Sequence, residues 1–335
     1  MRHSKIHLTL LAAAFLTLVS CQRIPLYDAQ SGVFLKLDYE LELLPAVSED
    51  VDLEAAPSLR SKVAGKLPEH VRACFFDAAT HTLVRDVYLP AQGDFVNVEP
   101  GNYDLLVYAL GTEVTQVTDG ETRGGALAFT SRTGSKVKAS KAGVGLTGES
   151  ANIDNEIIFE PDILFTGQLP AVYIPVRSGQ QEPVVLEVTM RSAVEAWTFV
   201  ARNVRGVENV RKASVYMSGQ ASGKYLWDGR FPAKPVAVSF ENEANPQKHL
   251  LFSAFNTFGK IPTQESYAIL RITTVAGLSL QWVFDVTDQF ENPDNERHEI
   301  VVEDIIDVPE GSGSGGGVEP SVSDWTTEII DITLN

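Results

Sequence analysis

Apolar side chains recur at every second residue through much of the chain, and this period of two constrains the fold more than any other feature. From Val33 to Leu43 the odd-numbered positions are all apolar or aromatic, whereas the even-numbered positions are mostly charged. Successive side chains of a β-strand point to opposite faces of the sheet. The pattern therefore predicts a half-buried strand over residues 33–43 with its odd-numbered side chains in a core.

Further short strands with turn residues between them follow along the chain. No stretch after the first twenty residues keeps a period of 3.6 long enough to predict a helix. Many short strands separated by turns are typical of antiparallel β-sandwiches, so we expect an all-β fold. The other predicted strands cover residues 71–77, 83–89, 95–98, 103–108, 184–190, 213–217, 236–240, 267–275, 278–286 and a short stretch at 300–302.

The chain is long enough for two domains, since 335 residues exceed the usual size of one. Pro161, Pro170, Pro175 and Gly179 lie close together in the sequence, which indicates a domain boundary near residues 161–180. We therefore predict an N-terminal sandwich over 33–165 and a C-terminal one over 166–335. Residues 311–317 contain only Gly and Ser and read as a flexible linker. The linker precedes a predicted terminal strand, residues 324–334, which either closes its own sheet or exchanges with a neighbouring molecule through Trp325, Ile330, Ile332 and Leu334.

The first 21 residues have the pattern of an export signal. Arg2 and Lys5 precede an apolar stretch from Leu8 to Val19, which is short for a membrane span. The segment Leu18-Val19-Ser20-Cys21 resembles the bacterial lipobox, which implies a signal peptide over residues 1–20, cleavage before Cys21 and lipid on that cysteine. Residues 21–32 would then form a lipidated tether. The alternative is an ordinary secretory signal with an accidental cysteine.

Charge and motifs narrow the classes of function. The net charge of −17 repels nucleic acid and anionic headgroups, so we expect no nucleic-acid partner. No catalytic, dinucleotide or metal-binding fingerprint occurs, which argues against an enzyme and predicts no cofactor and no metal site. The acidic segment 285–296 is interpreted as a solvated loop, and Cys74 as a buried apolar residue. Tyr225 and Trp227 could contact a glycan, but aromatic residues in β proteins usually belong to the core.

Several stretches together resemble the fimbrillin-like lipoproteins of Bacteroidetes, in a branch near the minor-fimbrium anchor proteins. They include residues 100–108, 162–167, 204–210, 217–219, 255–259 and 285–289, and the ending from Ser323. The resemblance implies two tandem transthyretin-like (Greek-key) sandwiches in an outer-membrane lipoprotein displayed on the cell surface. It also implies a fimbrial subunit, anchor or tip adhesin whose partners are other fimbrial subunits. The alternative is a surface lipoprotein that captures glycans or a host surface.

In some members of that family a protease removes the first strand after an arginine, and neighbouring subunits then exchange a strand. Strand exchange uses main-chain hydrogen bonds at an open sheet edge. Arg60, which follows the predicted strand 33–43, is the residue that would match the cleavage position.

Lipidation is testable at Cys21. Cys21→Ser should either release the protein from the membrane fraction or leave uncleaved precursor, because several acyl chains are needed for stable anchoring. Cell fractionation measures the first outcome, and mass spectrometry of the mature N-terminus measures the lipid directly. A mature N-terminus without lipid would contradict the prediction.

Overall fold

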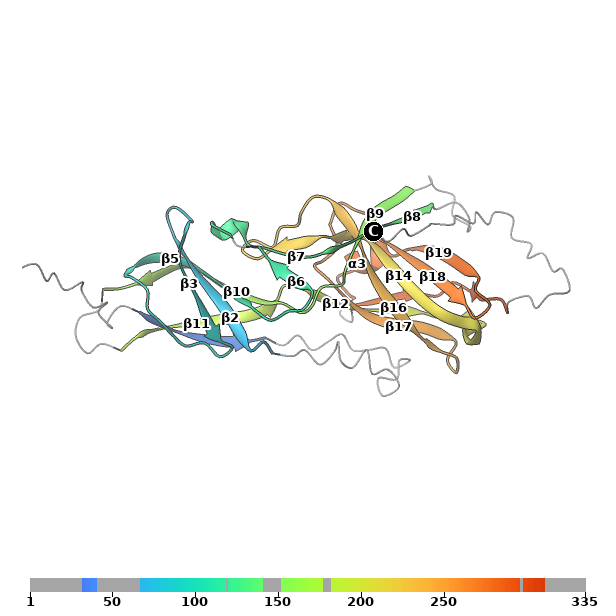
Figure 1. Cartoon of the computed structure of the whole chain (residues 1–335), viewed down its shortest axis with the longest axis horizontal. Coiled ribbons are helices and arrows are strands. Elements are labelled where there is room, and N and C mark those ends of the chain that lie inside the picture. The colour runs from blue at the N-terminus through green and yellow to red at the C-terminus, as the bar shows by residue number, and fades with distance from the viewer. Residues whose placement is uncertain are drawn as a thin grey trace, which may run out of the picture.

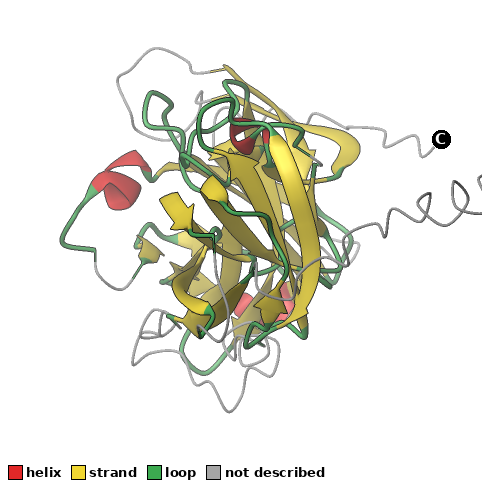
Figure 2. Cartoon of the chain, turned by 90° about the vertical axis from the view of Figure 1, so that its left-hand side faces the viewer, coloured by secondary structure: helices red, strands yellow, loops and turns green. Residues whose placement is uncertain are grey.

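The computed structural model of the chain consists almost entirely of β-strands, and the all-β prediction is confirmed (Figures 1 and 2). Within the described ranges, one short helix, α3 (Thr287–Glu291), and the 3-10 turns η1 (Arg123–Gly125) and η2 (Val207–Asn209) interrupt the strands. None of the helices in these ranges is long and apolar enough to cross a membrane. The structure describes residues 32–40, 67–118, 120–140, 152–176, 182–295 and 298–310.

One sheet of seven strands forms the first lobe, at the left of Figure 1. Its order is β3-β2-β5-β10-β11-β1-β4. The predicted hairpin over residues 71–89 is confirmed, since β2 and β3 pair across the turn at residues 78–81. The strands are β1 (Val33–Tyr39), β2 (His70–Asp77), β3 (Leu83–Pro90), β4 (Phe95–Val96), β5 (Gly101–Ala109), β10 (Phe165–Ile174) and β11 (Val184–Ser192).

A sheet of nine strands forms the second lobe, at the right of Figure 1. Seven of them follow the order β19-β18-β14-β16-β17-β12-β20, and β9 and β8 branch from β16. The strands are β8 (Arg132–Ser140), β9 (Asn152–Ile158), β12 (Glu195–Ala201), β14 (Val210–Ala221), β16 (Pro235–Asn245), β17 (Leu250–Thr257), β18 (Tyr267–Thr274), β19 (Ser279–Asp285) and β20 (Glu299–Val302).

Four strand pairs are parallel, in contrast to the purely antiparallel pairing expected from the sequence. They are β1 with β11, β9 with β16, β12 with β20, and the short pair β13 (Val204–Arg205) with β21 (Ile306–Asp307). Parallel partners need a long connection and leave no turn signal between them. The β1 and β11 partners are 151 residues apart, so no local pattern could reveal their pairing.

The sheets do not divide the chain at residue 165. β8 and β9 precede that residue but pair in the second lobe, whereas β10 and β11 follow it and pair in the first. The proline-rich stretch around residues 161–180 therefore includes the whole of strand β10 rather than a boundary between the sheets. Residues 1–31 and 311–335 lie outside the described residues, so the signal, tether, linker and terminal strand stay predictions.

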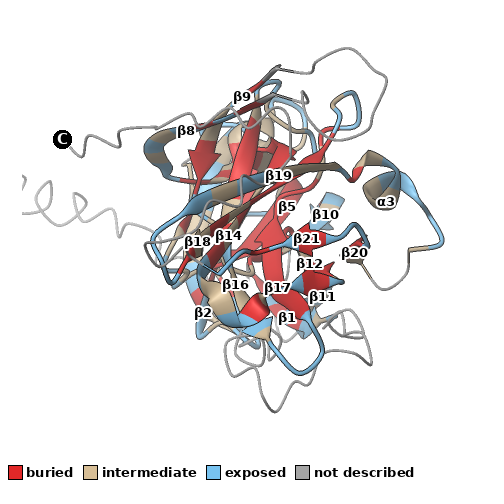
Figure 3. Cartoon of the chain, turned by 90° about the vertical axis from the view of Figure 1, so that its right-hand side faces the viewer, coloured by how far each residue is buried: buried red, intermediate tan, exposed pale blue. Residues whose placement is uncertain are grey.

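Two apolar cores fill the lobes. The first gathers side chains from β1, β2, β5, β10 and β11, and the second from β12, β14, β16, β17, β18 and β20. Figure 3 colours the buried residues of these strands red. β12 and β17 were missed in the sequence because β17 is buried at all eight positions and β12 at its last five. A strand buried on both faces has no alternation to detect.

The first core continues across the junction between the lobes. A small sheet joins β15 (Gly223–Tyr225) to β7 (Leu127–Thr130) and β6 (Thr115–Val117). Side chains that follow β15 and β17 in the second lobe, namely Leu226, Phe258 and Ile261, are buried in the core of the first lobe. The lobes are therefore connected by packed side chains as well as by the chain itself.

The core position of β1 predicts the effect of truncating it. Leu37→Ala should lower the free energy of unfolding by about 2–5 kcal/mol, because Leu37 is 6% exposed within the first core. Lys36→Ala on the opposite, exposed face is the matched control and should change it by less than about 1 kcal/mol, the worth of an exposed ion pair. Urea unfolding of both variants measures this, and a similar small loss for both would mean that β1 is peripheral.

Candidate functional site

β1 occupies a slot between β11 and a short partner, β4, and this slot is the main candidate site. Along β11 it forms seven register pairs, from Val33 with Val184 to Tyr39 with Met190. On its other edge β4 contributes only two register pairs, Val33 with Val96 and Phe34 with Phe95.

Backbone hydrogen bonds extend this second edge of β1 beyond β4. The N–H of Leu35 donates to Asp94 O at 3.0 Å, and the N–H of Leu37 donates to Gln92 O at 3.3 Å. Gly93 lies between these acceptors with φ +87°, and a Cβ there would lie 2.1 Å from Leu35 O. Only glycine allows the loop to approach β1 this closely.

The inward side chains of β1 carry most of its attachment. Val33, Leu35 and Leu37 are all buried, and burying each such side chain is worth about 1.5–3 kcal/mol. Tyr39 closes the end of the strand: its hydroxyl donates to Ala91 O at 2.9 Å, and its ring packs edge-on against Phe165 at 5.3 Å. Burial raises the pKa of Tyr39 to about 12, so this hydroxyl remains a donor.

Ion pairs on the outer face of β1 add little. Lys36 lies 3.0 Å from Glu187, and Glu40 lies 2.7 Å from Arg191, but all four side chains are at least half exposed. Such pairs are worth about 0–1 kcal/mol and are screened by salt. The slot therefore selects an extended segment with apolar residues at alternate positions, whichever chain supplies it.

All six residues predicted for lipidation, cleavage or exchange are outside the described part of the chain. These are Cys21, Arg60, Trp325, Ile330, Ile332 and Leu334. What the structure does place is β1 itself, which lies between Cys21 and Arg60 in the sequence.

Tyr225 and Trp227, predicted as a possible glycan contact, are described. Both are partly buried, and Trp227 packs against the first core. The guanidinium of Arg230 lies 4.7 Å from the centroid of the Tyr225 ring, and that of Arg123 lies 4.8 Å from the Trp227 ring. A sugar stacking on those faces would have to displace an arginine from each ring.

Arg123 also holds a buried carboxylate that the sequence analysis did not single out. Asp104 of β5 is 3% exposed; its Oδ2 accepts a hydrogen bond from Arg123 Nη1 and its Oδ1 accepts one from the N–H of Ala171 at 3.0 Å. Burial raises the pKa of Asp104, but these hydrogen bonds and the Arg123 charge outweigh burial and hold the pKa below its usual value. The one signal in the sequence is an acid within the buried run from Tyr103 to Tyr108.

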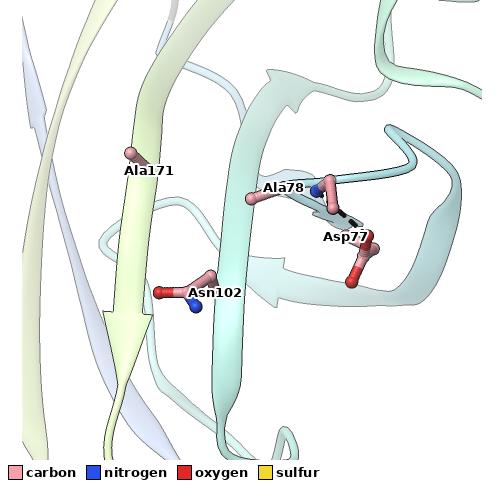
Figure 4. A pocket seen from close by; sticks show the side chains of 5 residues that line it. Asp77, Ala78, Asn102 and Ala171 are labelled. Atoms are coloured by element: carbon pink, nitrogen blue, oxygen red, sulfur yellow. Dashed lines mark hydrogen bonds between the residues drawn. The ribbon is translucent and has the colours of Figure 1, made fainter.

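An open hollow of about 410 Å³ lies near this pair, where β2 ends and β5 begins (Figure 4). The Asp77 carboxylate at its rim already accepts hydrogen bonds from the N–H groups of Ala79 and Thr80, at 3.0 and 2.8 Å. The hollow is lined by Asp77, Ala78, Ala79, Asn102 and Ala171. The hollow brings together no nucleophile and base. Across the described residues, no group of three or more His, Cys, Asp or Glu side chains could hold a metal ion.

Comparison with known proteins gives one family match. The profile of a family described as "Domain of unknown function (DUF5119)" matches residues 60–241, which is more than half of the chain.

A curated relative and several solved structures extend over most of the chain. The relative is a Bacteroides ovatus protein named "Putative fimbrium anchoring subunit Fim4B", 23% identical over 96% of this chain and 86% of its own length. A crystal structure of a "putative adhesin" from Bacteroides ovatus covers 88% of this chain and 98% of its own, with a TM-score of 0.59 and 20% identity. A second "putative adhesin" from that species covers 85% and 91%, with a TM-score of 0.50 and 12% identity. These structures share the fold.

The Asp104–Arg123 pair predicts a pH-dependent loss of stability. Arg123→Met should lower the free energy of unfolding by about 1–3 kcal/mol near neutral pH, because it leaves a buried carboxylate short of a partner. Since the pKa of Asp104 is lowered in the folded state, its contribution is present above the unfolded pKa of about 3.9 and disappears as the pH falls through the folded value. The difference between variant and wild type should therefore shrink in acid.

Urea unfolding at neutral and acidic pH measures this difference. Arg205→Met is the matched control, since Arg205 and its partner Asp307 are both 68% exposed and their pair should be worth under about 1 kcal/mol. An equal loss for the two variants, or one that does not change with pH, would contradict the role of the buried pair.

Proposed function

We propose that this chain, which belongs to the family described as Domain of unknown function (DUF5119), is a non-catalytic subunit that anchors a fimbrium to the cell surface. The observation that carries the proposal is the place of β1. This strand follows Cys21 in the sequence and is built into the first lobe by seven register pairs and three buried side chains. A pull on lipid at Cys21 would therefore be borne by the sheet.

The printed name of the Bacteroides ovatus relative, a fimbrium anchoring subunit, supports the same assignment. The site supports a non-catalytic role as well, because its parts suit the recognition of an extended strand rather than proton transfer or nucleophilic attack. We place the protein as a lipoprotein of the outer membrane, exposed at the cell surface, with other fimbrial subunits as partners.

The order of segments distinguishes an anchor from a subunit that is cut before it polymerises. Cys21, β1 and Arg60 follow one another in the chain. Cleavage after Arg60 would leave the lipid covalently attached to β1 alone, and the rest of the protein would be held only by the noncovalent contacts of that strand. An anchor therefore needs an intact Arg60 segment, and β1 stays in its slot.

Because β1 stays in its slot, another element must contact the next subunit. We assign this contact to the terminal segment that contains Trp325, Ile330, Ile332 and Leu334, because an extended segment with alternating apolar residues can add to an open sheet edge. The glycan-binding alternative draws no support from Tyr225 and Trp227, whose rings are covered by arginines.

Two variants in fimbriated cells test the proposal. Arg60→Ala should retain fimbriae on the cell as the wild type does, because an anchor does not require cleavage there. A chain ending at Glu310 should reach the membrane but lose its fimbriae to the medium. Fractionation of cells and medium, with immunodetection of the fimbrial subunits, measures both.

Membrane association of the shortened chain is the internal control, since it separates loss of contact from loss of export. Loss of assembled fimbriae with Arg60→Ala would contradict the anchor role and indicate a subunit that must be cleaved. Fimbriae that remain cell-bound with the chain ending at Glu310 would contradict the role of the terminal segment.

A further inference from the structure

Three exposed apolar side chains form a continuous row across adjacent strands of the first lobe. Phe34 of β1 is in register with Val185 of β11 on one side and with Phe95 of β4 on the other. They are 38%, 55% and 40% exposed, whereas Val33 and Leu35 beside Phe34 are fully buried. The row therefore lies on the outer face of the sheet, and we call it the apolar row.

The apolar row lies at the end of the first lobe that is remote from the second. β11 starts at Val184 and ends at Ser192, three residues before β12 of the second lobe begins. β1 runs parallel to β11, so Phe34 and Val185 lie at the far end of both strands. The first lobe is seen from this side in Figure 2.

Two further exposed apolar residues, at the end of β10, lie at the same remote end of the lobe. Tyr173 is 65% exposed and Val176, just beyond the strand, is 78% exposed. Tyr173 is paired with Asn102 near the start of β5, which marks the remote end of the sheet. Three of the five apolar residues at this end are aromatic.

The predicted lipid attachment lies a short distance from the apolar row along the chain. Eleven residues, 22–32, separate Cys21 from Val33. Eleven residues can span at most about 40 Å when fully extended. Lipid inserted in a bilayer would therefore keep this end of the lobe at the membrane surface, at a high effective concentration.

We infer that the apolar row docks on the headgroup–acyl boundary of the bilayer that holds the lipid, and so fixes the orientation of the lobe on the membrane. This inference rests on the proposed lipid anchor. Aromatic and aliphatic side chains at that depth are favourable, because aromatic rings suit the membrane interface and apolar area leaves water. A few apolar side chains bind weakly alone, which is sufficient when a lipid already holds the protein there.

The charges around the row select the lipid. Asp94 precedes Phe95 and is exposed, and Glu187 on β11 is exposed beside its partner Lys36. With a net charge of −17 the protein is repelled by anionic headgroups. The row therefore fits zwitterionic headgroups such as phosphatidylethanolamine. A second protein copy fits less well, since five side chains fall short of the roughly 1,000 Å² that a specific interface buries.

A fluorescent label on the row tests the inference. The full lipidated chain carries Val185→Cys labelled with an environment-sensitive dye, in vesicles of phosphatidylethanolamine and phosphatidylcholine. Cys74 is buried and Cys21 would be acylated, so the new thiol is the one that reacts. Dye emission should rise several-fold and be quenched by nitroxide-labelled lipids.

Val275→Cys labelled in the same way is the matched control, because Val275 is 68% exposed in the β18–β19 turn of the second lobe. Its dye should keep its aqueous emission. Adding Phe34→Thr and Phe95→Thr to the Val185→Cys protein should remove most of the rise, and replacing half of the lipid by anionic phosphatidylglycerol should weaken it.

The outcomes separate the inference from the anchor itself. Mass spectrometry first establishes lipid on Cys21, and its absence would overturn the anchor. If the lipidated protein binds vesicles but the dye at Val185 stays aqueous, the docking inference is overturned while the anchor stands. A rise that depends on protein concentration and occurs without vesicles would instead show that a second copy covers the row.

Discussion

The parallel pairing of β1 with β11 is the interaction on which the organisation of the first lobe depends. It joins residues 151 positions apart and places Val33, Leu35 and Leu37 in the core. β1 also lies between β11 and β4 in the sheet order. Among the described residues β4 pairs only with β1, so loss of β1 would leave β4 without a sheet partner. Because the strand is held by apolar burial and backbone hydrogen bonds rather than by ion pairs, its attachment should depend weakly on salt. That property suits a strand that transmits force from a membrane.

The two lobes are coupled through packed side chains as well as through the chain. The segment after β15 places Leu226 in the first core, and Trp227 beside it is covered by Arg123, which in turn binds the buried Asp104. The chain also passes between the lobes repeatedly, with β8 and β9 in one and β10 and β11 in the other. A load applied at β1 would therefore reach the second lobe through the side chains after β15 and β17 that pack in the first core.

The side chains of β1 that fill the slot and the side chain that it contributes to the apolar row lie on opposite faces of this one strand. The odd-numbered side chains of β1 fill the core, and Phe34 between them points outward into the row. Retention of β1 thus serves both the internal sheet and the proposed orientation on the bilayer. A subunit that lost β1 would lose the connection to the proposed lipid, the occupant of the slot and the centre of the row together.

Alternation in the sequence was sufficient to predict the all-β class, the alternating burial of β1, the β2–β3 hairpin and the β18–β19 hairpin, because each depends on residues near one another in the chain. The burial of Cys74 was predicted for the same reason, from the apolar strand around it. The fully buried strands β12 and β17 escaped detection, since burial on both faces removes the period of two. Only the tertiary structure decided three features. These are the placement of β8 and β9 in the second lobe and of β10 and β11 in the first, the Asp104–Arg123 pair, and the row of Phe34, Phe95 and Val185. All of them arise from pairing between distant segments, and the free energy of that pairing depends on which surfaces meet in space, a quantity that no local pattern of residues contains.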